Sequence, residues 1–105
     1  MENANTISIP RGDTARRSIE IFTEEGDLYE IKEEDTLILR VKKSLLDKEP
    51  CIVKEIKGGC DFHIKPEDTE NLAFGNYIYS VRIFTADGDK YTVIDKKNFE
   101  IAEVV

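Results

Sequence analysis

Cys51, Cys60 and His63 are the residues in this sequence best suited to bind a metal ion. A structural zinc site needs four nitrogen or sulfur ligands that converge on the ion. These three residues lack the paired spacing of a zinc-binding motif. His63 also points outward if its neighbours Phe62 and Ile64 face a core. We therefore expect no metal site.

No catalytic motif is readable in the sequence either. His63 is the single histidine, and it has no serine or cysteine motif that would make it part of a hydrolytic triad. The chain also lacks the glycine-rich loops that bind nucleotides. We expect a protein without catalytic residues or cofactors, and therefore not an enzyme.

Three short glycine turns contain acidic residues in patterns that resemble binding motifs. Glu25–Asp27 and Asp87–Asp89 hold paired carboxylates, but an EF-hand loop needs carboxylates at several fixed positions and a distal bidentate glutamate. Arg11–Asp13 spells the integrin-recognition tripeptide, and three residues recur by chance. We interpret all three as surface turns between strands.

The composition indicates an acidic chain of one domain. Its 105 residues have room for a single core, so we expect one domain over residues 1–105. The formal net charge of −7 opposes binding to nucleic-acid phosphates, which takes clustered lysine and arginine. No apolar run approaches the roughly 20 residues of a membrane span, and the first residues show no signal peptide. We expect protein partners, without nucleic acid or membrane.

The two cysteines fit a reducing compartment. If residues 56–59 close a two-residue hairpin turn, Cys51 faces Ile64 and Cys60 faces Glu55 across the ladder. The two sulfur atoms would then be too far apart for a disulfide. Free thiols are typical of the cytoplasm, which is where we expect the protein.

Short alternating segments between turn signals predict an all-β fold. Residues 36–42, TLILRVK, alternate apolar and polar side chains, and residues 77–83 do the same. Turn residues recur about every eight to twelve positions without an amphipathic helix, which indicates a sandwich or barrel. We expect Asp61–Ile64 to pair back on Cys51–Ile56. The expected strands are Thr6–Ile9, Ala15–Thr23, Leu28–Ile31, Thr36–Lys42, Cys51–Ile56, Asp61–Ile64, Tyr77–Ile83, Lys90–Ile94 and Asn98–Val104.

Two segments of the chain resemble each other. Ile21–Tyr29 reads IFTEEGDLY and Ile83–Tyr91 reads IFTADGDKY, with six of nine positions identical. One interpretation is that two hairpins use the same turn chemistry. Another is that they form a pseudo-symmetric pair, with one hairpin in each sheet. One repeated segment does not establish a repeat period, so we expect no solenoid.

Residues 66–79 predict a capped turn that leads into a central strand. Acidic and hydroxyl residues at its start, among them Asp68, suit the first turn of a helix, and Gly75 can leave that turn in a left-handed conformation. Tyr77 then begins the strand. In sandwich folds a tyrosine there bonds back to the turn as a tyrosine corner, with its ring in the core. We expect structural roles for Tyr77, Gly75, Asp68 and Leu72.

The combination of these stretches resembles a known group of proteins. The informative parts are Arg11-Gly12-Asp13-Thr14, Gly26-Asp27, Ile64-x-Pro66-Glu67-Asp68-Thr69-x-x-Leu72-x-x-Gly75-x-Tyr77-x-Tyr79, Asp87-Gly88-x-x-Tyr91-Thr92-Val93-Ile94 and Phe99-x-Ile101. They resemble small immunoglobulin-like β-sandwich proteins of phage and prophage structural gene clusters, which are similar to the N-terminal domain of phage upper baseplate proteins. The resemblance implies an immunoglobulin-like antiparallel β-sandwich. It also implies a non-enzymatic tail or baseplate component that acts as a homo-oligomer or with other tail proteins, first in the bacterial host cytoplasm and then in the virion.

Two other kinds of binding module fit the same pattern. One is a fibronectin-III-like adhesion module, which the absent export signal and the lack of tryptophan oppose. The other is a cytoplasmic module that pairs with an extended partner through an exposed edge strand. Because loops at sandwich ends commonly carry recognition, we expect the partner surface on an edge strand or on the hairpin tips at Asp27, Asp87 and Asp89.

Overall fold

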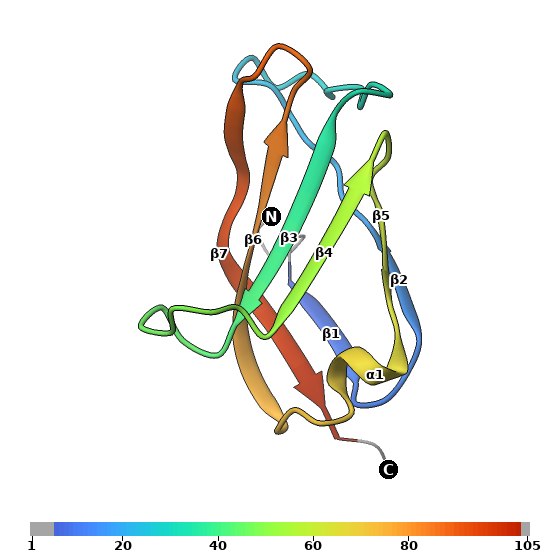
Figure 1. Ribbon diagram of the computed structural model, residues 1–105, viewed down its shortest axis with the longest axis vertical. Helices are drawn as coiled ribbons and strands as arrows, with labels where there is room; N and C mark the ends of the chain where they lie inside the picture. Colours follow the sequence, from blue (N-terminus) through green and yellow to red (C-terminus); the bar gives the residue numbers. More distant parts are fainter. Residues whose placement is uncertain (1–5, 104–105) are drawn as a thin grey trace.

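The protein, described over residues 6–103 of a computed structural model, is built mostly from β-strands (Figure 1). Within those residues one short helix is present, α1 (Pro66–Thr69). The strands are β1 (Ile7–Pro10), β2 (Ala15–Ser18), β3 (Thr36–Lys42), β4 (Ile52–Lys57), β5 (Asp61–Ile64), β6 (Gly75–Phe84) and β7 (Lys90–Ala102). The prediction of an all-β fold is therefore confirmed at this level, and the capped helical turn predicted from residue 66 is present as α1.

The strands form one large and one small sheet. The large sheet has the order β1-β7-β6-β3-β4, and the small sheet pairs β2 with β5. Figure 1 shows the large sheet curling so that β2 and β5 lie across from it. β1 runs parallel to β7, with Ile7 opposite Phe99. The expectation of a purely antiparallel fold is wrong at this pair, because the first strand reaches the sheet beside the last strand instead of through a hairpin.

β5 pairs with β2, with Phe62 opposite Arg17. The prediction that Asp61–Ile64 pairs back on the preceding strand is therefore wrong. The turn after β4 carries the chain from one sheet to the other, so that Phe62 and Ile64 can cover the apolar face of the large sheet. A hairpin on β4 would have extended the large sheet and left that face without a second layer.

Both sheets contribute side chains to one core. Alternate residues of β3 and β6 face it, as their period predicted. Tyr79 meets Phe99 edge to face with ring centroids 6.1 Å apart, a geometry that aromatic pairs prefer. On β4, Ile52 is buried and Val53 is exposed, which fixes the phase of that strand. The large side chains that are fully buried include Tyr79, Phe62, Phe99, Ile9, Leu37, Leu39, Ile64 and Ile101.

β7 is one strand of 13 residues, whereas the sequence predicted two, Lys90–Ile94 and Asn98–Val104. Its register against β6 shifts twice near its middle, so β7 has extra residues there. Lys96 lies in this irregular part with a φ of 54°, and its N–H donates to Ser80 Oγ at 3.2 Å. A β-bulge of this kind bends a strand without ending its ladder. Val104 lies outside the described residues.

The connection between β2 and β3 contains a small hairpin in place of the expected strand Leu28–Ile31. Beyond β2 an isolated bridge joins Phe22 to Leu28. Ile19 and Ile21 still face the core, as their alternation predicted. The predicted strand Ala15–Thr23 ends at Ser18 as β2. Because Leu28–Ile31 is not a strand and the last two predicted strands form the single strand β7, the described residues hold seven strands instead of nine.

Candidate functional site

Two hairpins lie side by side at one end of the molecule (Figure 1). One belongs to the β2–β3 connection and the other joins β6 to β7, and they contain the two similar segments 21–29 and 83–91. An open groove of about 540 Å³ lies between them. We call it the hairpin groove. Its apolar lining residues are Ile21, Phe22, Tyr29, Ile83, Tyr91 and Val93.

The two hairpins have the same hydrogen bonds at their turns. In the first, the Gly26 N–H donates to the Thr23 carbonyl at 2.9 Å, and the Asp27 N–H donates to Thr23 Oγ1 at 3.2 Å. In the second, the N–H of Gly88 donates to the Thr85 carbonyl at 3.0 Å, and the N–H of Asp89 donates to Thr85 Oγ1 at 3.2 Å. Both glycines have a positive φ, of 93° and 91°, which glycine adopts without strain. The shared turn chemistry accounts for the sequence similarity.

The hairpin end carries the negative charge of the chain. Residues 20–35 and 85–90 hold ten acidic residues and two lysines, a formal charge of −8. Since the whole chain carries −7, the remaining residues carry +1. This end therefore repels anionic partners and attracts cationic ones.

The three aspartates predicted as an interface all belong to this end. Asp27 and Asp89 occupy equivalent positions, and their carbonyls accept the threonine N–H at 2.8 and 2.9 Å. Asp89 Oδ2 also accepts a hydrogen bond from the Tyr91 hydroxyl at 3.4 Å. Asp87 lies at the tip of the second hairpin, and all three residues are exposed. The fold thus brings two tips that are far apart in sequence to one rim.

Asp35 is a buried carboxylate at this end that the sequence analysis did not identify. It is 2% exposed, and its Oδ2 accepts hydrogen bonds from the Tyr29 hydroxyl at 2.7 Å and from the Lys32 N–H at 3.0 Å. The hydrogen bond to Asp35, followed by burial and by the charges of Asp35 and Asp87, raises the pKa of Tyr29 to about 12. The only signal in the sequence is the three-residue spacing between Lys32 and Asp35, which suits a side chain that closes a turn.

Tyr77 has the geometry of a tyrosine corner at the other end of the large sheet. Its ring is 3% exposed, and its hydroxyl donates to the Ala73 carbonyl at 2.8 Å. Burial raises the pKa of this hydroxyl. Leu72 packs against the core beside it, and Gly75 has a φ of 135°. These residues fix the path from α1 into β6.

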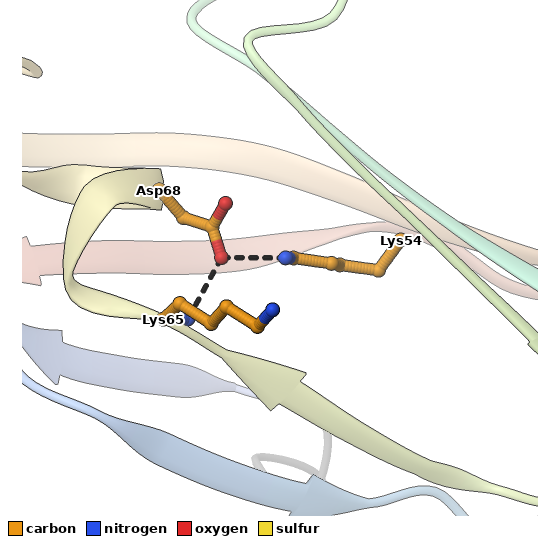
Figure 2. Close-up of polar contacts among 3 residues, drawn as sticks. All are labelled: Lys54, Lys65 and Asp68. Carbon is orange, nitrogen blue, oxygen red and sulfur yellow. Dashed lines mark hydrogen bonds and ion pairs between the residues drawn. The ribbon is translucent and has the colours of Figure 1, made fainter.

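Asp68 ties α1 to the edge of the large sheet. Figure 2 shows its Oδ2 accepting the Lys65 N–H at 2.7 Å and lying 2.6 Å from Lys54 Nζ of β4. Burial acts to raise the pKa of this carboxyl. The hydrogen bonds from Lys54 and Lys65 and the charges of the two lysines outweigh it, so the pKa lies below its ordinary value of 3.8. The contact bridges β4 and the turn that follows β5.

We expect Asp68→Asn to lower the free energy of unfolding by about 1 kcal/mol near neutral pH, the range of a helix cap or a partly exposed ion pair. Because the folded-state pKa is depressed, the ionised carboxylate stabilises the fold above its unfolded pKa and loses this effect as the pH falls further. Denaturant unfolding should therefore show the difference between wild type and variant shrinking below about pH 4. Glu67→Gln, at the exposed neighbour, is the control. An equal loss in both variants would contradict the role of Asp68.

The Arg11–Asp13 turn packs against the same region. The Gly12 N–H donates to the hydroxyl of buried Thr69 at 2.8 Å. The Arg11 guanidinium lies 4.2 Å from the centre of the Phe74 ring and donates to the Leu72 carbonyl at 3.4 Å. The first two residues of the tripeptide are therefore engaged within the chain, which agrees with its interpretation as a turn.

Cys51, Cys60 and His63 lie on different parts of the fold. The thiol of Cys51 donates to the Val41 carbonyl at 3.3 Å, and His63 pairs with Arg16 in the small sheet. Both cysteines are free. Over residues 6–103, no three histidine, cysteine, aspartate or glutamate side chains converge in a way that could hold a metal ion.

No protein-family model matches the chain, and no curated protein sequence matches it. In the part of the chain that the structure describes, no helix is long and apolar enough to cross a membrane.

Proposed function

We propose that the two sheets form an immunoglobulin-like β-sandwich of the variable type. In that fold the strands G, F, C and C′ are neighbours in one sheet. β7, β6, β3 and β4 follow the same order, with β1 added beside β7. β2 and β5 correspond to strands B and E of the facing sheet, and Tyr77 lies near the start of β6 as the tyrosine corner does near the start of strand F.

This assignment gives the hairpin groove a counterpart in a family of binding domains. In variable domains the B–C and F–G loops lie at one end and form part of the antigen-binding surface. Here the corresponding connections are the two hairpins that line the groove. The correspondence is an analogy of fold alone, so the function must be argued from the residues of the groove.

We propose that the protein is a non-enzymatic structural component of a phage or prophage tail or baseplate, which binds other proteins through its hairpin end. The observation that carries this proposal is an apolar groove with exposed Phe22 and Tyr91 and a strongly acidic rim. Buried aromatic anchors within a charged rim are typical of protein interfaces. The assignment to a tail or baseplate comes from the resemblance to phage structural proteins. It implies that the chain is made in the host cytoplasm and is then assembled into the virion.

Incorporation into particles tests the proposal. Phage or prophage particles from the native host are purified by density-gradient centrifugation, and the chain is detected with an antibody. We expect the wild-type chain in the particles, and we expect Asp27→Lys/Asp87→Lys/Asp89→Lys to reduce its incorporation severalfold, because the change reverses the charge of the rim. Glu67→Lys/Glu70→Lys/Glu103→Lys, which reverses three exposed charges outside the hairpin end, is the matched control. Particles that lack the wild-type chain would overturn the proposal.

A second candidate is a partner-binding module that uses β4. This strand pairs with β3 alone among the described strands, so its other edge has free backbone groups, and Val53 on it is 52% exposed. An extended partner could add a strand there. Val53→Pro would block such pairing, since proline lacks the N–H, and unchanged incorporation of this variant would argue against the β4 edge.

A further inference from the structure

The connection between β3 and β4 presents two leucines to solvent. Leu46 is 93% exposed and Leu45 is 59% exposed. The loop is ordered by its own hydrogen bonds, since the Leu46 N–H donates to Ser44 Oγ at 3.1 Å and the Ser44 N–H donates to Asp47 Oδ2 at 3.3 Å. In Figure 1 it projects from the side of the molecule. We call residues 43–51 the leucine loop. The two adjacent leucines form an apolar tip that is available for contact with a partner.

The leucine loop and the hairpin groove belong to opposite ends of β3. Thr36, the first residue of β3, pairs with Phe84 beside the second hairpin. Lys42, the last residue before the loop, pairs with Ile78 near the start of β6. One molecule can therefore offer its leucine loop to one neighbour while its hairpin groove receives the loop of another.

We propose that the hairpin groove of one copy of this chain binds the leucine loop of a second copy. The inference rests on the proposed function and names the partner at the groove. Leu45 and Leu46 insert between the two hairpins and cover Phe22 and Tyr91, which are 59% and 56% exposed in the single chain. Both surfaces lose their exposed apolar area in one contact.

Charge favours this head-to-tail contact over a contact between two grooves. Lys42, Lys43 and Lys48 flank the two leucines and outnumber Asp47 and Glu49, so residues 42–51 carry a formal charge of +1. The Asp47 carboxylate is turned toward the Ser44 N–H of its own loop. These lysines meet a hairpin end with a formal charge of −8. Two hairpin ends would repel each other. A head-to-tail contact closes into a ring where the rotation permits and extends into a filament where it does not.

Sedimentation velocity of the purified full chain over a range of concentrations tests the contact, with two complementary variants. Leu45→Ser/Leu46→Ser removes the tip and keeps the groove, and Phe22→Ser/Tyr91→Ser removes the apolar lip and keeps the tip. Val53→Ser is the control, because it removes a similarly exposed apolar side chain from the β4 edge. Circular dichroism and thermal unfolding verify that each variant folds, which we expect since all five side chains are exposed.

We expect the wild type and Val53→Ser to grow in mass with concentration. Each double variant alone should remain a monomer, and an equimolar mixture of the two should form a complex of two chains, since one intact loop and one intact groove remain.

A wild type that is monomeric at every concentration, or a mixture that does not combine, would overturn the proposal. Loss of association in Val53→Ser alone would also overturn the proposal, because it would assign the self-association to the β4 edge. A monomer that still enters particles overturns this contact and leaves the proposed function standing. A chain that self-associates but is absent from particles overturns the proposed function and leaves this contact standing.

Discussion

Replacing Tyr77 with alanine should lower the free energy of unfolding by about 3–5 kcal/mol, the range for removing a large aromatic side chain from a core. The ring is almost completely buried and its hydroxyl bonds to the Ala73 carbonyl. The substitution leaves a cavity and also leaves that carbonyl without its tyrosine donor. Because Tyr77 links the turn after α1 to the first residues of β6, we expect the loss to act on the whole fold.

Two further variants separate the contributions of the ring and the hydroxyl. Tyr77→Phe keeps the ring and should cost about 1 kcal/mol, the net value of one hydrogen bond. Tyr91→Ala removes a tyrosine that is 56% exposed and should change stability by about 0.5 kcal/mol or less. Denaturant unfolding measures all three. A loss below about 1 kcal/mol in Tyr77→Ala would show that the ring is outside the core.

Replacing Asp35 with alanine should cost about 1–3 kcal/mol, because two partly buried donors lose the buried carboxylate that accepts from them. Those donors are the Tyr29 hydroxyl and the Lys32 N–H. Asp35→Asn keeps an acceptor oxygen and should cost less. Glu34→Ala, at the exposed neighbour, is the control and should be close to neutral. Equal stabilities of the Asp35→Ala and Glu34→Ala variants would contradict the buried network.

The same network makes stability depend on alkaline pH. The pKa of Tyr29 rises from its ordinary value of 10.0 to about 12 in the fold, first because of its hydrogen bond to Asp35. A raised folded-state pKa contributes stability that is complete below about pH 10 and is lost as the pH rises to about 12. Because burial also raises the pKa of Tyr79 to about 12, absorbance titration of tyrosinate should show more than one late-ionising residue, and Tyr29→Phe should reduce the late absorbance change by one tyrosine. In Asp35→Asn the late ionisation of Tyr29 should move to lower pH.

The central strands could be predicted because their pattern is local. β3 and β6 have neighbours on both sides and one buried face, so their side chains alternate without interruption. The partners of β1 and β5 could not be predicted in this way, since the residues that pair lie far apart and no local pattern specifies the pairing. The bulge at Lys96 was hidden for a related reason. A charged run without glycine indicates a strand end, but here the Ser80 hydroxyl accepts the N–H of Lys96 and the ladder continues.

The candidate site was partly accessible from sequence. The tips at Asp27 and Asp89 follow from turn chemistry that is contained in five consecutive residues, with a threonine and a glycine at fixed spacing. Their meeting across a groove depends on how the β2–β3 connection packs, which is a tertiary property. Asp35 was missed because it follows three other charged residues, and nothing in such a run shows which carboxylate is buried.

The parallel pairing of β1 with β7 has a consequence for how the chain folds during synthesis. Of the seven strands described, β1 leaves the ribosome first, and its partner leaves last. Until then Ile7 and Ile9 have no ladder to join, although both are buried in the finished fold. Pairings between residues so far apart in sequence form slowly, because nearly the whole chain must be ordered between them. The large sheet is thus completed by the strand that was made first.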